Sequence, residues 1–233
     1  MPPVAINSLL DPCPICLETP RAGMDDVYRA TVCWKCGFRP APLFNEAVFV
    51  DGDVRLTGTG TTVATIAHTV VGAGGIASID FENITQIYAH LRLVGSLRGT
   101  TAVASTTAGL RINDDAAASY YWQRLQGQAA ATAALESLGA SEGNFSVMPG
   151  SLAGAGLFAS ATIEIPDYTS AFRKMAMSQF ATREGVATNQ VRIGQYAIGW
   201  GGTVPITKLS LLPPADLFAE GSTATLYGLP PFT

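Results

Sequence analysis

The sequence has little charge. Charged residues make up 14% of its 233 positions, whereas soluble domains average about 25%. The 14 lysines and arginines are scattered singly, and the net charge is -4. A protein that binds a nucleic-acid duplex usually carries a clustered basic face, so this composition argues against a nucleic-acid partner.

Residues for common catalytic chemistry are also scarce. The chain has two histidines, His68 and His90, and it lacks the G-x-S-x-G sequence of a nucleophile elbow. The glycine run Gly72–Gly75 lacks the lysine that follows in a phosphate-binding loop. These absences predict that the protein is not an enzyme.

The chain contains no long hydrophobic run. Its longest weakly polar stretch, Ile66–Ile79, is interrupted by His68 and by Gly72–Gly75, so we expect no membrane insertion. Residues 1–7 have neither a basic segment nor an apolar core, and we therefore expect no secretion signal.

Cysteine occurs at four positions only, in two C-x2-C pairs separated by sixteen residues: Cys13, Cys16, Cys33 and Cys36. This spacing is typical of a zinc ribbon, in which four thiolates surround one ion. Two disulfides are the alternative, but the βαβ pattern of a redox C-x-x-C protein is missing. Iron in a rubredoxin-like site has the same ligand geometry and stays open. Four thiolates leave no position for substrate, so the predicted zinc is structural.

Three segments follow from the composition: a zinc-ribbon-like module at 1–43, a β-rich arm or connector at 44–77, and a β domain at 78–233. The proline-rich Arg39–Pro42 marks the end of the module. The connector is rich in Val, Thr and Gly and is expected to contain strands, with Gly72–Gly75 as a hinge.

Short segments with alternating apolar and polar residues recur after Ser78: Tyr88–Leu93, Leu110–Asn113, Ala161–Ile165, Val191–Ile193, Lys208–Leu211 and Thr223–Tyr227. Such strands place apolar side chains on a core face and polar ones in solvent. They predict an all-β fold, an antiparallel, jelly-roll-like β-sandwich. Gln128–Leu138 is compatible with a short helix or with a surface loop.

Two features of the β domain suggest local roles. Asp114 and Asp115 follow a strand and are expected to form an Asx turn. Tyr120, Tyr121 and Trp122 form an aromatic cluster that could stack on a sugar, although core packing or subunit contact is the more common role of such residues.

Residues 79–230 resemble a β domain of bacteriophage virion proteins, of the tail-fibre-like and capsid-decorating or head-fibre-like kinds. The resemblance is carried by these segments: Phe81–Gln86, Tyr88, His90–Leu91, Leu110–Asp114, Tyr120–Tyr121, Ile165–Tyr168, Gly199–Trp200, Leu209–Pro213 and Leu226–Gly228. One departure is Thr85, where the family typically has proline. The resemblance implies a β-sandwich and a place in a virion assembled in the host cytoplasm, but it transfers no binding residues.

These observations predict a virion structural protein, a capsid decoration or head-fibre protein attached through its N-terminal region. Its partners would be other capsid or tail proteins. Because the hydrophobic content of 48% comes with little charge, we also expect a homo-oligomer, with a trimer as one option. The alternatives are a tail-fibre or tail-tip adhesin that binds a host surface glycan, and a nucleic-acid-binding zinc ribbon.

Overall fold

The chain divides into two units, Met1–Gly58 and Thr59–Thr233. The computed structural model describes residues 63–184 and 190–230, together with the backbone of four strands in the first unit. These four strands form two antiparallel hairpins. The first joins β1 (Ala22–Asp25) to β2 (Ala30–Cys33), and the second joins β3 (Ala47–Val50) to β4 (Asp53–Leu56).

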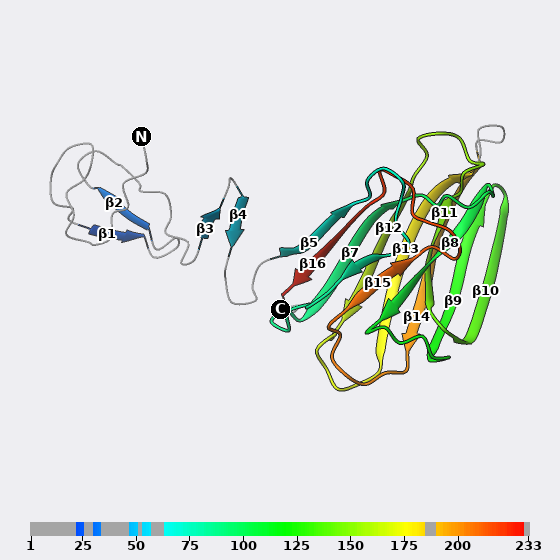
Figure 1. Cartoon of the computed structure of the whole chain (residues 1–233). Coiled ribbons are helices and arrows are strands. Elements are labelled where there is room, and N and C mark those ends of the chain that lie inside the picture. The colour runs from blue at the N-terminus through cyan, green and yellow to red at the C-terminus, as the bar shows by residue number, and fades with distance from the viewer. Residues whose placement is uncertain are drawn as a thin grey trace. The chain divides into compact units, whose positions relative to one another are not determined.

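The second unit consists of two antiparallel sheets (Figure 1). In spatial order, the eight-stranded sheet contains β10 (Ala131–Ala140), β9 (Tyr120–Gln128), β14 (Gln190–Trp200), β13 (Lys174–Glu184), β12 (Ala159–Pro166), β7 (His90–Leu97), β16 (Thr223–Leu229) and β5 (Ala64–Val70). The four-stranded sheet contains β11 (Gly143–Pro149), β8 (Ser105–Ile112), β15 (Leu209–Leu212) and β6 (Ile79–Phe81). Among the described residues there is no helix, and the predicted all-β class is confirmed.

The core lies between the two sheets. Leu93, Ile163 and Leu226 face inward from the larger sheet, and each is at most 1% exposed. Leu110 and Leu211, on the smaller sheet, are fully buried. Alternation along β12 shows how the sequence specifies this arrangement, because its inward side chains are buried while every second residue faces away.

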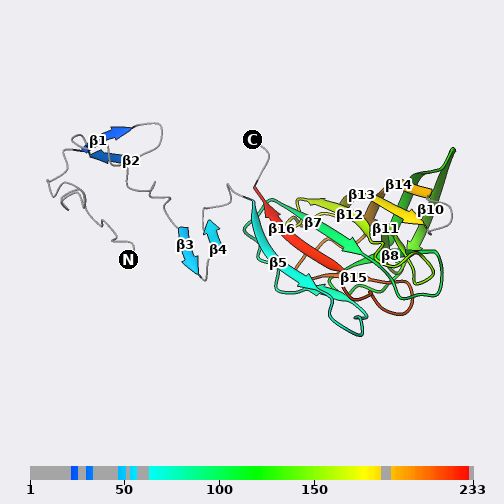
Figure 2. The ribbon, with the colours of Figure 1, turned by 90° about the horizontal axis from the view of Figure 1, so that it is seen from above.

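Each of the six predicted strand segments overlaps a strand of the structure. The sheets are unequal, however, with eight strands against four. Residues 64–70, which we assigned to the connector, form β5 at one edge of the larger sheet, where they pair with β16. Figure 2 shows β16 between β5 and β7.

The expectation of a helix or loop at Gln128–Leu138 is wrong. Residues 131–140 form β10, which pairs along its length with β9 after a tight turn at Ala129, whose φ is 51°. The helical propensity of this alanine-rich segment is weak compared with the pairing of nine of its ten residues with β9.

The glycine run after β5 is a packed turn. The amide of Gly75 donates to the carbonyl of Gly72 at 3.2 Å, and Ile76 pairs with Phe218. Gly75 has a φ of 77°, and a Cβ at this position would lie 2.5 Å from the carbonyl oxygen of Phe218. Gly75 is therefore required by close packing, whereas Gly72 and Gly74 face open space, and the hinge stays a prediction.

The turn after β8 confirms the expected Asx geometry at Asp115. Its Oδ1 accepts a hydrogen bond from the amide of Ala117 at 2.9 Å. Its Oδ2 accepts hydrogen bonds from Ser119 Oγ at 2.6 Å and from Trp200 Nε1 at 2.7 Å. This carboxylate therefore ties the turn to the end of β14.

We predict that Tyr120→Phe destabilises the sandwich by about 1–3 kcal/mol. The buried hydroxyl of Tyr120 accepts a hydrogen bond from the amide of Ile112 at 2.8 Å, and burial raises its pKa to about 12. Phenylalanine leaves that amide without its partner. Urea denaturation measures the loss, and Tyr121→Phe, at a half-exposed neighbour, should change stability by less than about 0.5 kcal/mol. Equal stabilities of Tyr120→Phe and wild type would contradict a stabilising role for this buried hydrogen bond.

We also predict that Asp115 stabilises the folded protein and that this stabilisation is lost in acid. Hydrogen bonds from Ser119 and then Trp200 hold its pKa below the ordinary 3.8. The unfolded state therefore binds the proton first, so stabilisation is present above pH 3.8 and is lost as pH falls through the lowered pKa.

Thermal unfolding of wild type and Asp115→Asn between pH 6 and pH 2 tests this. The variant should be less stable at pH 6, by about 1–3 kcal/mol, and the difference should shrink in acid. Burial raises the pKa of Glu142, which acts with the opposite sign but is common to both proteins. Asp216→Asn, at an exposed turn with a φ of 61°, is the control. A stability difference between wild type and Asp115→Asn that stays constant from pH 6 to pH 2 would refute the stabilising role of the Asp115 carboxylate.

Candidate interaction surface

One face of the eight-stranded sheet is turned away from the four-stranded sheet, and we refer to it as the outer face. On four adjacent strands, β10, β9, β14 and β13, large apolar side chains on this face are between 48% and 73% exposed. They are Tyr121, Leu125, Leu138, Met175, Met177, Val191 and Ile193. We call these seven side chains the apolar face.

Strand register brings these residues together from distant parts of the sequence. Leu138, Tyr121, Gly199 and Met175 lie opposite one another across the four strands. Gly199 has no side chain, and the side chain of Met175 lies against its Cα. A Cβ there would lie 3.3 Å from the sulfur of Met175.

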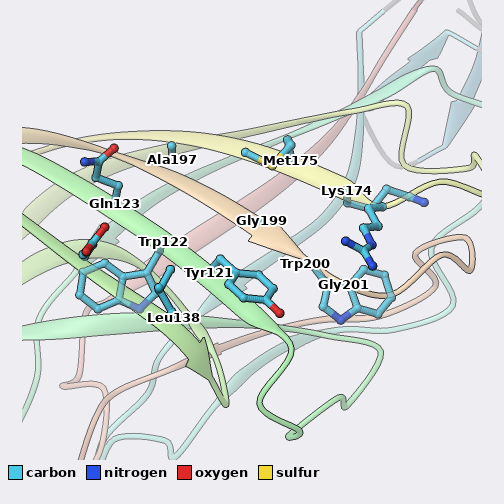
Figure 3. A pocket seen from close by; sticks show the side chains of 12 residues that line it. Tyr121, Trp122, Gln123, Leu138, Lys174, Met175, Ala197, Gly199, Trp200 and Gly201 are labelled. Carbon is cyan, nitrogen blue, oxygen red and sulfur yellow. The ribbon is translucent and has the colours of Figure 1, made fainter.

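Two shallow grooves run across the apolar face. The first, of about 370 Å³, is lined by Tyr121, Leu138, Met175 and their neighbours (Figure 3). The second, of about 620 Å³, includes Leu125 and Ile193. The lining of the first groove includes three charged residues, Glu136, Arg173 and Lys174, whereas that of the second includes none. The second groove therefore suits an uncharged partner surface.

The outer face of these four strands is nearly free of charge. Among the described residues, only Glu136 and Arg183 are charged and directed outward there, as alternation along β10 and β13 shows. At the neighbouring strands β12 and β7 the composition changes, since Arg92 and Glu164 form an ion pair at 2.6 Å. This ion pair marks a polar border to the apolar face.

The alternation of β14 is opposite to the expected one. Val191 and Ile193 are 56% and 59% exposed, whereas Arg192 faces inward and donates to Gln128 Oε1 at 2.6 Å. The sequence pattern had suggested apolar side chains in the core and arginine in solvent. The pattern predicted a strand correctly but the wrong face.

The same inversion is present on β9. Arg124 is 8% exposed and donates to the hydroxyl of Tyr196 at 3.1 Å. Its guanidinium also lies 5.7 Å from the centre of that ring. Polar contacts inside and apolar side chains outside therefore distinguish this end of the sheet from the strands around β12.

The aromatic cluster Tyr120–Trp122, for which core packing or subunit contact was expected more than stacking on a sugar, does not form one surface. Tyr120 is fully buried. Trp122 faces inward, where its ring packs edge-on against the ring of Tyr196, with 5.7 Å between the two ring centres. Tyr121 alone of the three faces outward. Consecutive strand residues point to opposite faces, so three adjacent aromatics cannot share one.

Sequence reasoning missed Met175, Met177, Val191 and Ile193 as parts of a surface. Their strands were read as ordinary core strands, or were not singled out. A signal existed in β13 and β14, where both alternating sets contain apolar residues, such as Phe180 with Met177 and Tyr196 with Ile193. Choosing between two such sets requires the position of the second sheet.

The predicted metal ligands Cys13, Cys16 and Cys36 lie outside the described residues, and of Cys33 only the backbone, at the end of β2, is described. The zinc site stays a prediction. Within the part of the chain that the structure describes, no group of three His, Cys, Asp or Glu side chains could hold a metal ion. No described helix is long and apolar enough to cross a membrane.

Comparison of the chain with models of known protein families, with curated proteins and with solved structures finds no match. The function is therefore argued from the apolar face and from the sequence.

Proposed function

We propose that the protein is a structural component of a bacteriophage particle, a capsid decoration or head-fibre protein that works by binding neighbouring subunits. The observation that carries this proposal is the apolar face, where seven large side chains on four strands are about half exposed. Soluble monomers rarely leave so many adjacent apolar groups in water, whereas assembly proteins bury them at contacts.

The choice of a phage particle rests on the sequence. The strand motifs between residues 79 and 230 resemble virion β domains, and the low charge of 14% suits a protein surrounded by others. A predicted zinc site formed by the four cysteines would fold a small N-terminal attachment module, because metal binding supplies the folding free energy that such a module lacks.

We expect the protein in purified virions at a constant ratio to the major shell protein. Mass spectrometry of gradient-purified particles measures this ratio, and antibody-gold labelling gives the location. Gold on the head supports decoration, and gold at the tail tip supports the adhesin alternative. Absence from particles, with the protein present in the infected cell, would refute a virion role.

We expect Cys33→Ser to abolish metal binding by the full-length protein. Wild type should bind about one zinc per chain, because four thiolates complete one tetrahedral site. Thr31→Ser, two residues earlier in β2, is the control and should keep its metal.

Metal analysis of the purified proteins measures the effect, and iron in place of zinc would identify the rubredoxin-like alternative. The thermal transition of the sandwich should be the same in both variants, since Thr59–Thr233 is a separate compact unit. Full metal content in Cys33→Ser would contradict the four-thiolate site.

A further inference from the structure

The apolar face is large enough to serve as a complete protein interface. A complete large side chain presents about 150–200 Å², so these seven partly exposed side chains present roughly 600–800 Å². The largest patch on a typical monomer is about 300–600 Å². A standard interface buries about 800 Å² on each partner. The apolar face thus approaches the area that one side of a stable dimer needs.

The few charges on the apolar face favour a second copy of this chain as its partner. A two-fold contact places a surface against a copy of itself, so a face whose charges are all of one sign would repel its copy. The apolar face avoids this penalty, because the outward charges among the described residues of its strands are one acidic and one basic, Glu136 and Arg183, and a further basic residue, Arg173, lines the first groove just before β13. A partner with a strongly charged surface would find no complement there.

The shape of the face suits sheet-on-sheet packing. Between the large side chains, the outward positions of the four strands hold three exposed glutamines, Gln123, Gln179 and Gln195, and small residues such as Gly199, Ala197, Ala181 and Ala134. The small residues leave the shallow grooves into which side chains of an opposing sheet can fit, as in a sandwich whose layers lie about 10 Å apart. The Arg92–Glu164 ion pair gives a polar rim on the β12 side.

The free edge of β10 offers a different contact, the pairing of strands between two copies, but this contact would not bury the apolar face. Joining two β10 edges would extend the sheet while leaving both copies of the apolar face in water. Only packing of one face on another removes Leu125, Met177 and Ile193 from solvent.

We infer that the apolar face of β9, β10, β13 and β14 packs against the same face of a second copy of this chain, around a two-fold axis. This inference rests on the proposed role of the face as an assembly surface, and it names the partner. A two-fold axis passes through the centre of the patch that it relates to itself. Leu125, on β9 between the Tyr121 row and the Ile193 row, lies closest to that centre.

Light scattering coupled to size-exclusion chromatography tests the inference on the full chain. Wild type should have twice the chain mass of 24.3 kDa at micromolar concentration. Leu125→Lys and Leu125→Glu should each weaken dimerisation at least about 100-fold, because like charges would meet near the axis. Mixing the two variants should restore the dimer, since lysine would then face glutamate.

A matched control is Leu152→Lys. Leu152 is 69% exposed and lies outside the apolar face, so this variant should stay a dimer. Circular dichroism checks that all variants fold, and Leu138→Lys, at a 73% exposed position on the face, gives a second disruption with minimal effect on the core.

A wild-type monomer or trimer, or a Leu125→Lys protein that keeps the dimer mass, would overturn the inference. Restored association in the mixture identifies the partner as a copy of this chain, and failure to restore it also overturns the inference. The two proposals fail separately. A monomer found on virions refutes only the two-fold contact, and a dimer absent from virions refutes only the virion role.

Discussion

The structure depends on the burial of one face of the eight-stranded sheet against a sheet of half its width. Strand pleating assigns each residue to one of two faces, and the four-stranded sheet buries only one of them. Around β7, β12 and β16 this produces an ordinary sandwich, with Leu93, Ile163 and Leu226 inside. The wide sheet extends past this cover to β9 and β10, where the same pleating has a different consequence.

At that end, the inward positions are partly polar and the outward positions are apolar. Arg124 is held by the hydroxyl and ring of Tyr196, and Arg192 by Gln128. Buried polar groups need such partners, so the inward arrangement is specified by several contacts at once. Val191 and Ile193 are thereby placed in solvent, which is why we treat their exposure as a functional feature and not as an accident of composition.

The end of β14 that adjoins the apolar face is secured from the core side. Trp200 is 4% exposed, and its indole N–H is fixed by Asp115 in the turn after β8. Tyr120, on the next strand, is fixed by the backbone of Ile112. Both contacts tie the wide sheet to the four-stranded one, so the apolar face lies on a rigid support. A rigid surface loses little conformational entropy on association.

The sequence by itself determined the all-β class and the approximate places of strands such as Ala161–Ile165, because period-two alternation is a local property of the chain. It also determined the Asx turn at Asp115, whose partner is two residues away. Tertiary structure decided the rest. The packed turn at Gly75 and the outward direction of Val191 and Ile193 depend on partners distant in sequence. The strand at 131–140 pairs with the adjacent strand β9 across a tight turn, but its alanine-rich sequence has no apolar–polar alternation that would mark it as a strand. Alternation says that two sets of residues face opposite ways, and only the position of the second sheet says which set is buried.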